Sequence, residues 1–196
     1  MIGSSSILLG RVLTVAMVER LAQYATTAKQ QEFEWDFTQG VEAYETWDEI
    51  EVGRSGPGAR VFEVAEEDIL AFNRSCLETD PLLVDPEYAA AHGGLRQHPL
   101  FVVQVVFYCI DTGIGSWLRS PGARNPGQRI ELFEPFSIGE RISATITHRD
   151  KWIRRDKNYV EDQVDLHNQD GVLKATWFTR LILPPDRAEL IRYASM

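Results

Sequence analysis

Cysteine is scarce in this chain: 196 residues contain two, Cys76 and Cys109. They lie far apart, and neither belongs to a CxxC or Cys/His pattern, which excludes a cysteine-based zinc site and a disulfide framework. Both lie in apolar stretches of helical character, where a buried, inert thiol is expected. We therefore expect a reducing, cytoplasmic location and no metal or redox cofactor.

Positive charge is also low. The chain has 20 Lys and Arg residues against 29 Asp and Glu, which gives a net charge of -9. A surface with this charge repels the phosphate backbone of nucleic acids and anionic lipid. Nucleic acid and membrane surfaces are therefore excluded as expected partners.

The sequence has no uninterrupted apolar run long enough to span a bilayer. Residues 7–24 are apolar, but Arg11, Glu19 and Arg20 interrupt them. A secretory signal carries its positive charge before the apolar run, whereas Arg11 lies inside it. We expect a helix here, packed on its own domain or on a partner subunit.

The chain divides into one compact domain with appendages and contains no internal repeat. Residues 1–45 form an expected N-terminal helical extension, whose polar part, 25–44, is a connector or a second amphipathic helix. Residues 46–186 form the expected domain, and residues 187–196 a C-terminal tail. Glycines and proline at 53–58 predict a loop before a short alternating run at 60–64.

Two patterns predict the architecture of the domain. Residues 99–118 are the longest apolar segment, and a helix there would be buried on nearly all sides. Later runs have the alternation of strands, with hairpin turns indicated at 137–139 and 168–171. A sheet of consecutive antiparallel strands wrapped around one buried helix is the simplest α+β architecture that explains both. The predicted strands are 129–133, 141–152, 157–167 and 172–183.

Several segments resemble the MaoC-like dehydratases, the (R)-specific enoyl-CoA hydratase group. Residues 64–72 are similar to the family's first strand passing into its first helix, and residues 80–89 to its hydratase loop and the next helix. Residues 154–160 and 168–171 are typical of its last hairpins. The resemblance covers residues 46–185 and implies a hot-dog fold, in which a sheet is rolled around one buried helix.

The catalytic motif that the resemblance implies is altered. The family's hydratase loop carries an Asp and a His that hold the water added to the enoyl thioester. Aligning the chain on Pro81 puts Glu78 in the Asp position, Asp80 in the Asn position and Leu83 in the His position. Glu78 remains a carboxylate, whereas Leu83 transfers no proton. Ordinary hydratase chemistry by the family mechanism is not expected from this chain alone.

A second difference lies where the buried helix begins. The family has His-Gly there, with backbone N–H groups directed at the thioester carbonyl. This chain has His98-Pro99, and proline has no N–H. The amides of Leu100 and Phe101 are expected to be free, because helices leave their first N–H groups unpaired.

The candidate catalytic residues are Asp80, His98 and Glu78, each with a structural alternative. His98 is either a relocated general acid or base, working with Asp80 or Glu78, or a histidine bonded to loop backbone. Asp80 is the type of residue that caps a helix or an Asx turn before proline. Glu78 is otherwise a solvent-exposed carboxylate. Asp111 matches the position of a thioesterase carboxylate but is more simply a helix-end residue.

The candidate substrate-binding residues are Leu83, Pro99, Leu100, Phe101, Arg154 and Arg155. Arg154 and Arg155 belong to a basic cluster suited to the phosphates of coenzyme A or a carrier-protein arm. Asp150 and Asp156 dilute that cluster, so a solvated hairpin is the favoured alternative. The other histidines, including His148, show no carboxylate pairing in their spacing.

Three functions follow. The first is a diverged enzyme with dehydratase, hydratase or isomerase-type chemistry on an acyl thioester or a similar conjugated carbonyl compound. The second is a non-catalytic subunit of a two-chain hydratase, whose partner supplies an intact Asp and His. The third is a small-molecule or acyl-binding module. The resemblance implies a homodimer, or a heterodimer with another hot-dog subunit, and coenzyme A or a carrier protein as part of the substrate.

Overall fold

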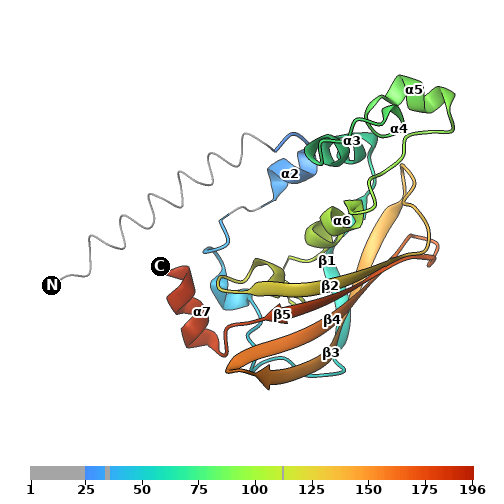
Figure 1. The fold of residues 1–196 in the computed structure, drawn as a ribbon. Helices are drawn as coiled ribbons and strands as arrows, with labels where there is room; N and C mark the ends of the chain where they lie inside the picture. Colours follow the sequence, from blue (N-terminus) through green and yellow to red (C-terminus); the bar gives the residue numbers. More distant parts are fainter. Residues whose placement is uncertain (1–24, 34–35, 112) are drawn as a thin grey trace.

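The computed structural model describes residues 25–33, 36–111 and 113–196 (Figure 1). The described residues form one sheet of five antiparallel strands in the order β1-β3-β4-β5-β2. The expected antiparallel α+β architecture is confirmed, but the strands are not all consecutive. The hairpin predicted at 137–139 is wrong, because β2 pairs with β5 and not with β3. The strands are β1 (Ser55–Glu63), β2 (Arg124–Leu132), β3 (Arg141–Arg154), β4 (Lys157–His167) and β5 (Leu173–Ile182).

Alternation along the long strands places one face of the sheet in the core. On β3, Ile142, Ala144 and Ile146 are buried, and Val160, Val164 and Leu166 are buried on β4. The predicted hairpin between β4 and β5 is confirmed. Its turn is stabilised by the Asn168 side chain, which accepts the N–H groups of Asp170 and Val172 at 3.1 and 2.9 Å.

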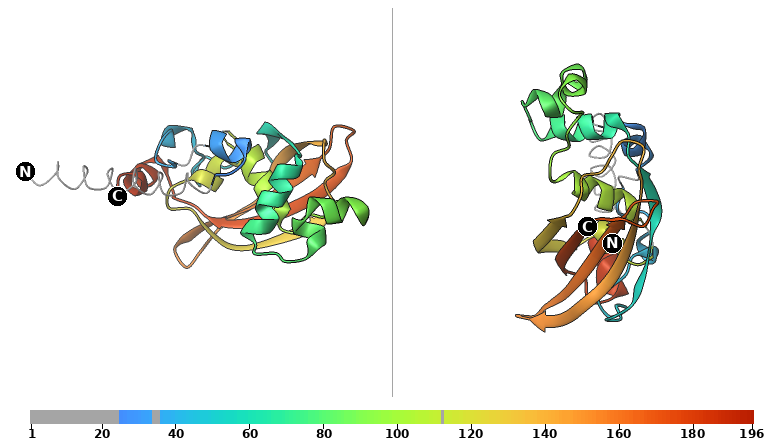
Figure 2. Two further views of the ribbon diagram at one scale, coloured as in Figure 1. Left: turned by 90° about the horizontal axis from the view of Figure 1, so that it is seen from above. Right: turned by 90° about the vertical axis from the view of Figure 1, so that its right-hand side faces the viewer.

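The buried helix α6 (Phe101–Cys109) lies against the core face of the sheet (Figure 2). It is much shorter than the apolar segment 99–118 suggests, so the expectation of one long helix is wrong. The backbone becomes extended at Ile110, and Gly113 and Gly115 adopt positive φ before the short η2 (Ser116–Arg119). Residues such as Ile114 and Trp117 are apolar because they fill the core, not because they continue a helix.

Three helices gather at one end of the sheet: α3 (Glu66–Ser75), α4 (Pro81–Val84) and α5 (Pro86–Ala91). The first turn of α3 carries Glu66, Glu67 and Asp68, as predicted, and acidic residues stabilise a helix N-terminus. Pro81 and Pro86 stand at the first position of α4 and α5, where the missing proline N–H costs no hydrogen bond. Cys76, expected to be buried, is exposed at the end of α3, whereas Cys109 is buried.

The segments outside the predicted domain are also partly helical. The connector contains α2 (Ala28–Glu32) and η1 (Val41–Ala43), and the expected tail forms α7 (Arg187–Ala194) at the opposite end of the molecule from α5 (Figure 1). Arg187 donates to the Val41 carbonyl at 2.8 Å, which ties α7 to η1. The helix predicted at 7–24 lies outside the described residues. Among the described helices, none has the length and apolarity to cross a membrane.

Candidate active site at the start of the buried helix

Asn73 on α3 organises the loops around the candidate site. Its side chain is fully buried, and its Nδ2 donates to the carbonyls of Leu83 and Arg96 at 2.7 and 2.9 Å. Its Oδ1 accepts the backbone N–H of His98 at 2.8 Å. One side chain thereby fixes the hydratase-like loop against the segment that enters α6. Sequence reasoning missed Asn73, although an Asn inside an otherwise apolar helix face is a usable signal.

Replacing Asn73 with alanine is expected to lower the free energy of unfolding by about 1–3 kcal/mol, because buried backbone groups lose their partners. Chemical denaturation of Asn73→Ala measures the change. Ser75→Ala, at an exposed position of the same helix, is the control and is expected to stay within about 0.5 kcal/mol of the unmodified chain. Equal losses of unfolding free energy in the two variants would contradict the organising role of Asn73.

Glu78 and His98 are brought together. The Glu78 Oε1 atom lies 3.5 Å from the Nε2 atom of His98, and both side chains are partly exposed. Glu78 follows α3, and His98 precedes α6, so the pair joins two loops that Asn73 already holds in place. Solvent reaches both groups.

The hydrogen bonds of His98 define its tautomer. Its Nδ1 faces the backbone N–H of Leu100 at 3.0 Å and accepts that bond. A neutral imidazole with an accepting Nδ1 carries its proton on Nε2. The protonated Nε2 lies 3.5 Å from Glu78 Oε1, at the limit of hydrogen-bond distance.

Asp80 is not part of this pair. Its carboxylate accepts the backbone N–H of Leu82 at 2.9 Å and caps α4. This is the alternative role that the sequence offered for an Asp before Pro81. Asp80 is exposed two residues from Glu78, and its catalytic role stays a prediction.

The backbone N–H groups of Leu100 and Phe101, where α6 begins, both have hydrogen-bond partners. Leu100 N–H bonds to His98 Nδ1, and Phe101 N–H donates to the His98 carbonyl at 2.9 Å. The expectation that these two amides are free is therefore wrong, because the short turn at His98-Pro99 folds back on them. Pro99 and Leu100 have exposed side chains, whereas the Phe101 ring is fully buried in the core.

The other predicted substrate-binding residues are divided between the two ends of the sheet. Leu83 is half-buried in α4, and its carbonyl is held by Asn73. Arg154 and Arg155 lie at the exposed β3–β4 turn. Arg141, at the other end of β3, pairs with Glu63 just before α3. The 14 residues of β3 separate these ends by roughly 40 Å. Within one chain, the two arginines do not share a site with Glu78 and His98.

Asp111 is occupied by ion pairs. Its carboxylate contacts Arg60 at 2.6 Å and also pairs with Arg119. Asp111 lies just beyond the C-cap of α6, as the helix-end interpretation predicts. Among the described residues, no group of three or more His, Cys, Asp and Glu side chains is placed to hold a metal ion.

A buried histidine–carboxylate cluster was missed by sequence reasoning. His148 on β3 and Asp162 on β4 are register partners, both fully buried, with Nδ1 and Oδ1 2.8 Å apart. Nε2 of His148 faces Glu45 at 3.4 Å, and Glu45 also accepts the Gly115 N–H at 2.7 Å. Strand alternation was the available signal, because His148 shares the inward face with Ile146.

The cluster keeps His148 charged. Burial alone lowers the pKa of His148, but hydrogen bonds and charge from Asp162 and Glu45 outweigh burial and raise the pKa to about 9. Burial raises the pKa of Asp162, and the contact with His148 opposes that rise. Through Glu45, the cluster connects the end of the N-terminal extension to the sheet. Because His148 and Asp162 are closed to solvent, they take no part in surface chemistry.

Comparisons with known proteins place this geometry in a fold. No protein-family model matches the chain. A curated Streptomyces griseus protein, named UPF0336 protein, is 26% identical over 144 residues, which cover 69% of this chain and 93% of that protein.

The solved structures are more informative about architecture. An (R)-hydratase from Pseudomonas aeruginosa matches with a TM-score of 0.59 and 21% identity, covering 72% of this chain and 86% of its own. A MaoC-like dehydratase from Rhodospirillum rubrum matches with a TM-score of 0.58 and 21% identity, covering 71% and 96%. The chain has the hot-dog fold of the MaoC-like dehydratases. The family resemblance in the sequence therefore predicted the fold correctly.

One further hot-dog structure is a complex. The HadBC (3R)-hydroxyacyl-ACP dehydratase of Mycobacterium tuberculosis matches with a TM-score of 0.55 and 21% identity, covering 67% of this chain and 96% of its own. In the hot-dog fold described here, Glu78 and His98 lie where the central helix α6 begins.

Proposed function

We propose that this hot-dog protein adds water to, or removes it from, an α,β-unsaturated acyl thioester, with Glu78 and His98 as its catalytic pair. The observation that carries the proposal is the approach of Glu78 Oε1 and His98 Nε2 to 3.5 Å at a solvent-accessible position beside α6. The hydratases and dehydratases with the same fold support the class of reaction. Fold alone does not define chemistry, so the pair is what the proposal depends on.

The reaction balances with this pair. The Glu78 carboxylate takes a proton from water as the water oxygen bonds to the β-carbon, and the electron pair of the C=C bond moves to the α-carbon and thioester oxygen. The resulting carboxylic acid returns that proton to the α-carbon. We further propose that His98, whose Nε2 lies 3.5 Å from Glu78 Oε1, orients the carboxylate and the water by hydrogen bonding and keeps its own proton.

The experiment is crotonyl-CoA hydration by the purified chain, alongside His98→Gln. We expect kcat/KM to fall by about tenfold to a hundredfold in His98→Gln, because a misplaced carboxylate and water are costly even when the base remains. His92→Gln, at the exposed C-cap of α5, is the control and is expected to keep full activity. Unchanged activity in His98→Gln would contradict a role for the pair.

A second candidate function is a non-catalytic subunit, and Leu83 favours it. Leu83 occupies the position where the family resemblance implies a catalytic histidine, and the fold occurs in a two-component dehydratase complex. The mass of the purified chain in solution, with and without a co-expressed hot-dog partner, separates the two functions. A stable heterodimer that is active only with the partner's Asp and His intact would favour the subunit.

A further inference from the structure

An apolar cavity of about 330 Å³ lies on the side of α6 that faces α3 and the N-terminal segment. Its volume is at the lower end of the range for small-molecule sites, about 300–1,000 Å³. The walls are almost entirely apolar, and six of the lining side chains are aromatic. The lining residues are Lys29, Gln30, Phe33, Phe37, Phe62, Phe72, Val103, Gln104, Phe107 and Tyr108.

The positive charge of Lys29, which lines the cavity, is neutralised by Asp68. Lys29 Nζ lies 2.6 Å from the fully buried carboxylate of Asp68 and 5.0 Å from the centre of the Phe62 ring. The Gln30 side-chain oxygen accepts the Thr26 and Thr27 N–H groups at 2.8 and 3.2 Å. An anionic ligand therefore finds no unpaired cation at Lys29, and the cavity suits an uncharged apolar chain.

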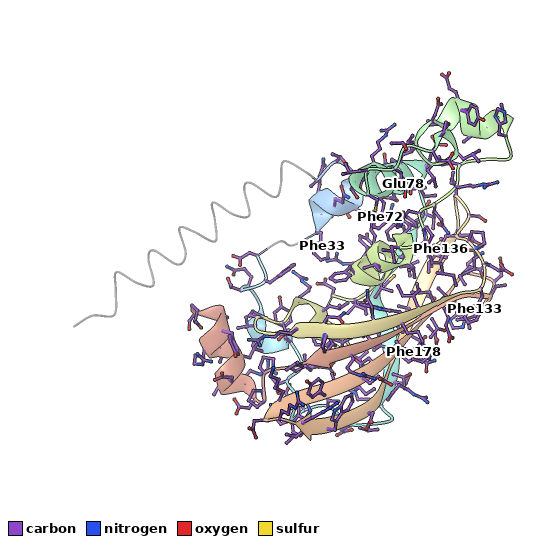
Figure 3. The ribbon with its side chains drawn as sticks, in the orientation of Figure 1. Phe33, Phe72, Glu78, Phe133, Phe136 and Phe178 are labelled. Carbon is purple, nitrogen blue, oxygen red and sulfur yellow. The ribbon has the colours of Figure 1, made fainter. Side chains whose placement is uncertain are left out.

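The cavity is one aromatic ring away from the Glu78–His98 pair. Phe72 lines the cavity, and its ring centre is 5.9 Å from that of His98. In Figure 3, Phe72 is labelled between Phe33, on the cavity side, and Glu78. The Phe72 ring therefore contacts the cavity and lies close to His98.

The outer wall comes from the N-terminal segment. Phe33 and Phe37 pack edge to face with ring centres 6.2 Å apart. The guanidinium of Arg119, which is buried and paired with Asp111, lies 5.1 and 5.5 Å from their ring centres. Cation–π contacts of this kind hold the two rings against the domain, so this wall is built into the fold.

We propose that this cavity binds the apolar acyl chain of the thioester substrate and that Phe33 and Phe37 set the chain length it accepts. The inference rests on the proposed function for the position of the reacting carbon. It adds a role for the N-terminal segment, which closes a chain-binding cavity that α3, α6 and β1 leave open on one side.

The test is equilibrium binding of butyryl-pantetheine and octanoyl-pantetheine by calorimetry. Both are saturated and undergo no hydration, and pantetheine is common to coenzyme A and carrier-protein arms. Each additional buried methylene is worth about a fourfold gain in affinity, so we expect octanoyl-pantetheine to bind at least about tenfold more tightly. Equal affinities for the two chains would overturn the proposal.

Two variants locate the effect in the cavity. Val103→Trp fills the cavity from α6, and it is expected to remove the octanoyl preference. Phe37→Ala opens the outer wall and is expected to weaken octanoyl binding by about fivefold or more. The matched controls are Val172→Trp, at an exposed position, and Glu32→Ala, beside Phe33 but outside the lining.

The outcomes separate the two proposals. A chain-length preference that Val103→Trp or Phe37→Ala removes, in a chain without hydratase activity, supports the cavity and contradicts the proposed function. Hydratase activity without a chain-length preference contradicts the cavity alone. If Val103→Trp fails to fold by circular dichroism, Phe37→Ala decides the result, and an unchanged octanoyl affinity in Phe37→Ala overturns the role of the wall.

Discussion

Glu78→Gln is expected to lower kcat/KM for hydration of crotonyl-CoA by about 10²–10⁴-fold, the usual contribution of a general base. The substitution keeps the shape of the side chain but removes the carboxylate that accepts a proton from water. Because His98 Nδ1 already accepts the Leu100 N–H, His98 has no free basic nitrogen on the side of Glu78 to replace it. A steady-state assay of the purified variant measures the loss.

The matched control is Glu87→Gln, at an exposed position in the first turn of α5. It changes the same charge within a few residues of the candidate site and is expected to leave kcat/KM unchanged. Circular dichroism and denaturation of both variants establish that folding is intact. A Glu78→Gln variant as active as Glu87→Gln would exclude Glu78 as the base.

His148→Ala is expected to destabilise the chain by about 3–5 kcal/mol, the cost of leaving a buried charge without its partner. The variant leaves Asp162 fully buried without its charged partner and removes the contact between Glu45 and β3 that His148 makes. Denaturant unfolding measures the loss. His92→Ala, at an exposed position, is the control and is expected to change stability by less than about 0.5 kcal/mol.

The same cluster predicts the direction of a pH dependence. The pKa of His148 is raised from 6.5 to about 9, so its contribution is complete below about pH 6.5 and is lost as the pH rises through about 9. At 1.36 kcal/mol per pKa unit, the loss of unfolding free energy amounts to about 3 kcal/mol. Burial raises the pKa of Asp162, which works against the pair.

Unfolding free energies measured at about pH 6 and about pH 10 test this dependence. His148→Ala is expected to show a much flatter profile, whereas His92→Ala is expected to follow the unmodified chain. Stability that rises between these two pH values, or that falls equally in His148→Ala, would contradict a charged His148.

Local patterns predicted much of the fold. Alternation identified β3 and β4 as strands, and the Asn168–Gly171 segment predicted its hairpin, because both signals depend on residues close in sequence. The predicted length of α6 was wrong, because a run of apolar residues indicates burial and does not indicate helical conformation. The turn at Gly113 and Gly115 was the contrary signal.

The candidate site was predictable only in part. Pairing of Glu78 with His98 was among the alternatives, because the family resemblance brought both loops to one place. The role of Asn73 and the tautomer of His98 depend on backbone groups up to 25 residues away in sequence. The His148–Asp162 contact depends on strand register, which spacing along the chain does not reveal.

The most direct test of the central claim is deuterium incorporation during hydration of crotonyl-CoA in D₂O, followed by NMR. The purified chain is expected to give a 3-hydroxyacyl product with one deuterium on the α-carbon, and Glu78→Gln, prepared in parallel, is expected to give almost none. An unmodified chain that forms no product without a second hot-dog subunit, or a Glu78→Gln variant that labels the α-carbon as fast, would contradict catalysis by Glu78 and His98.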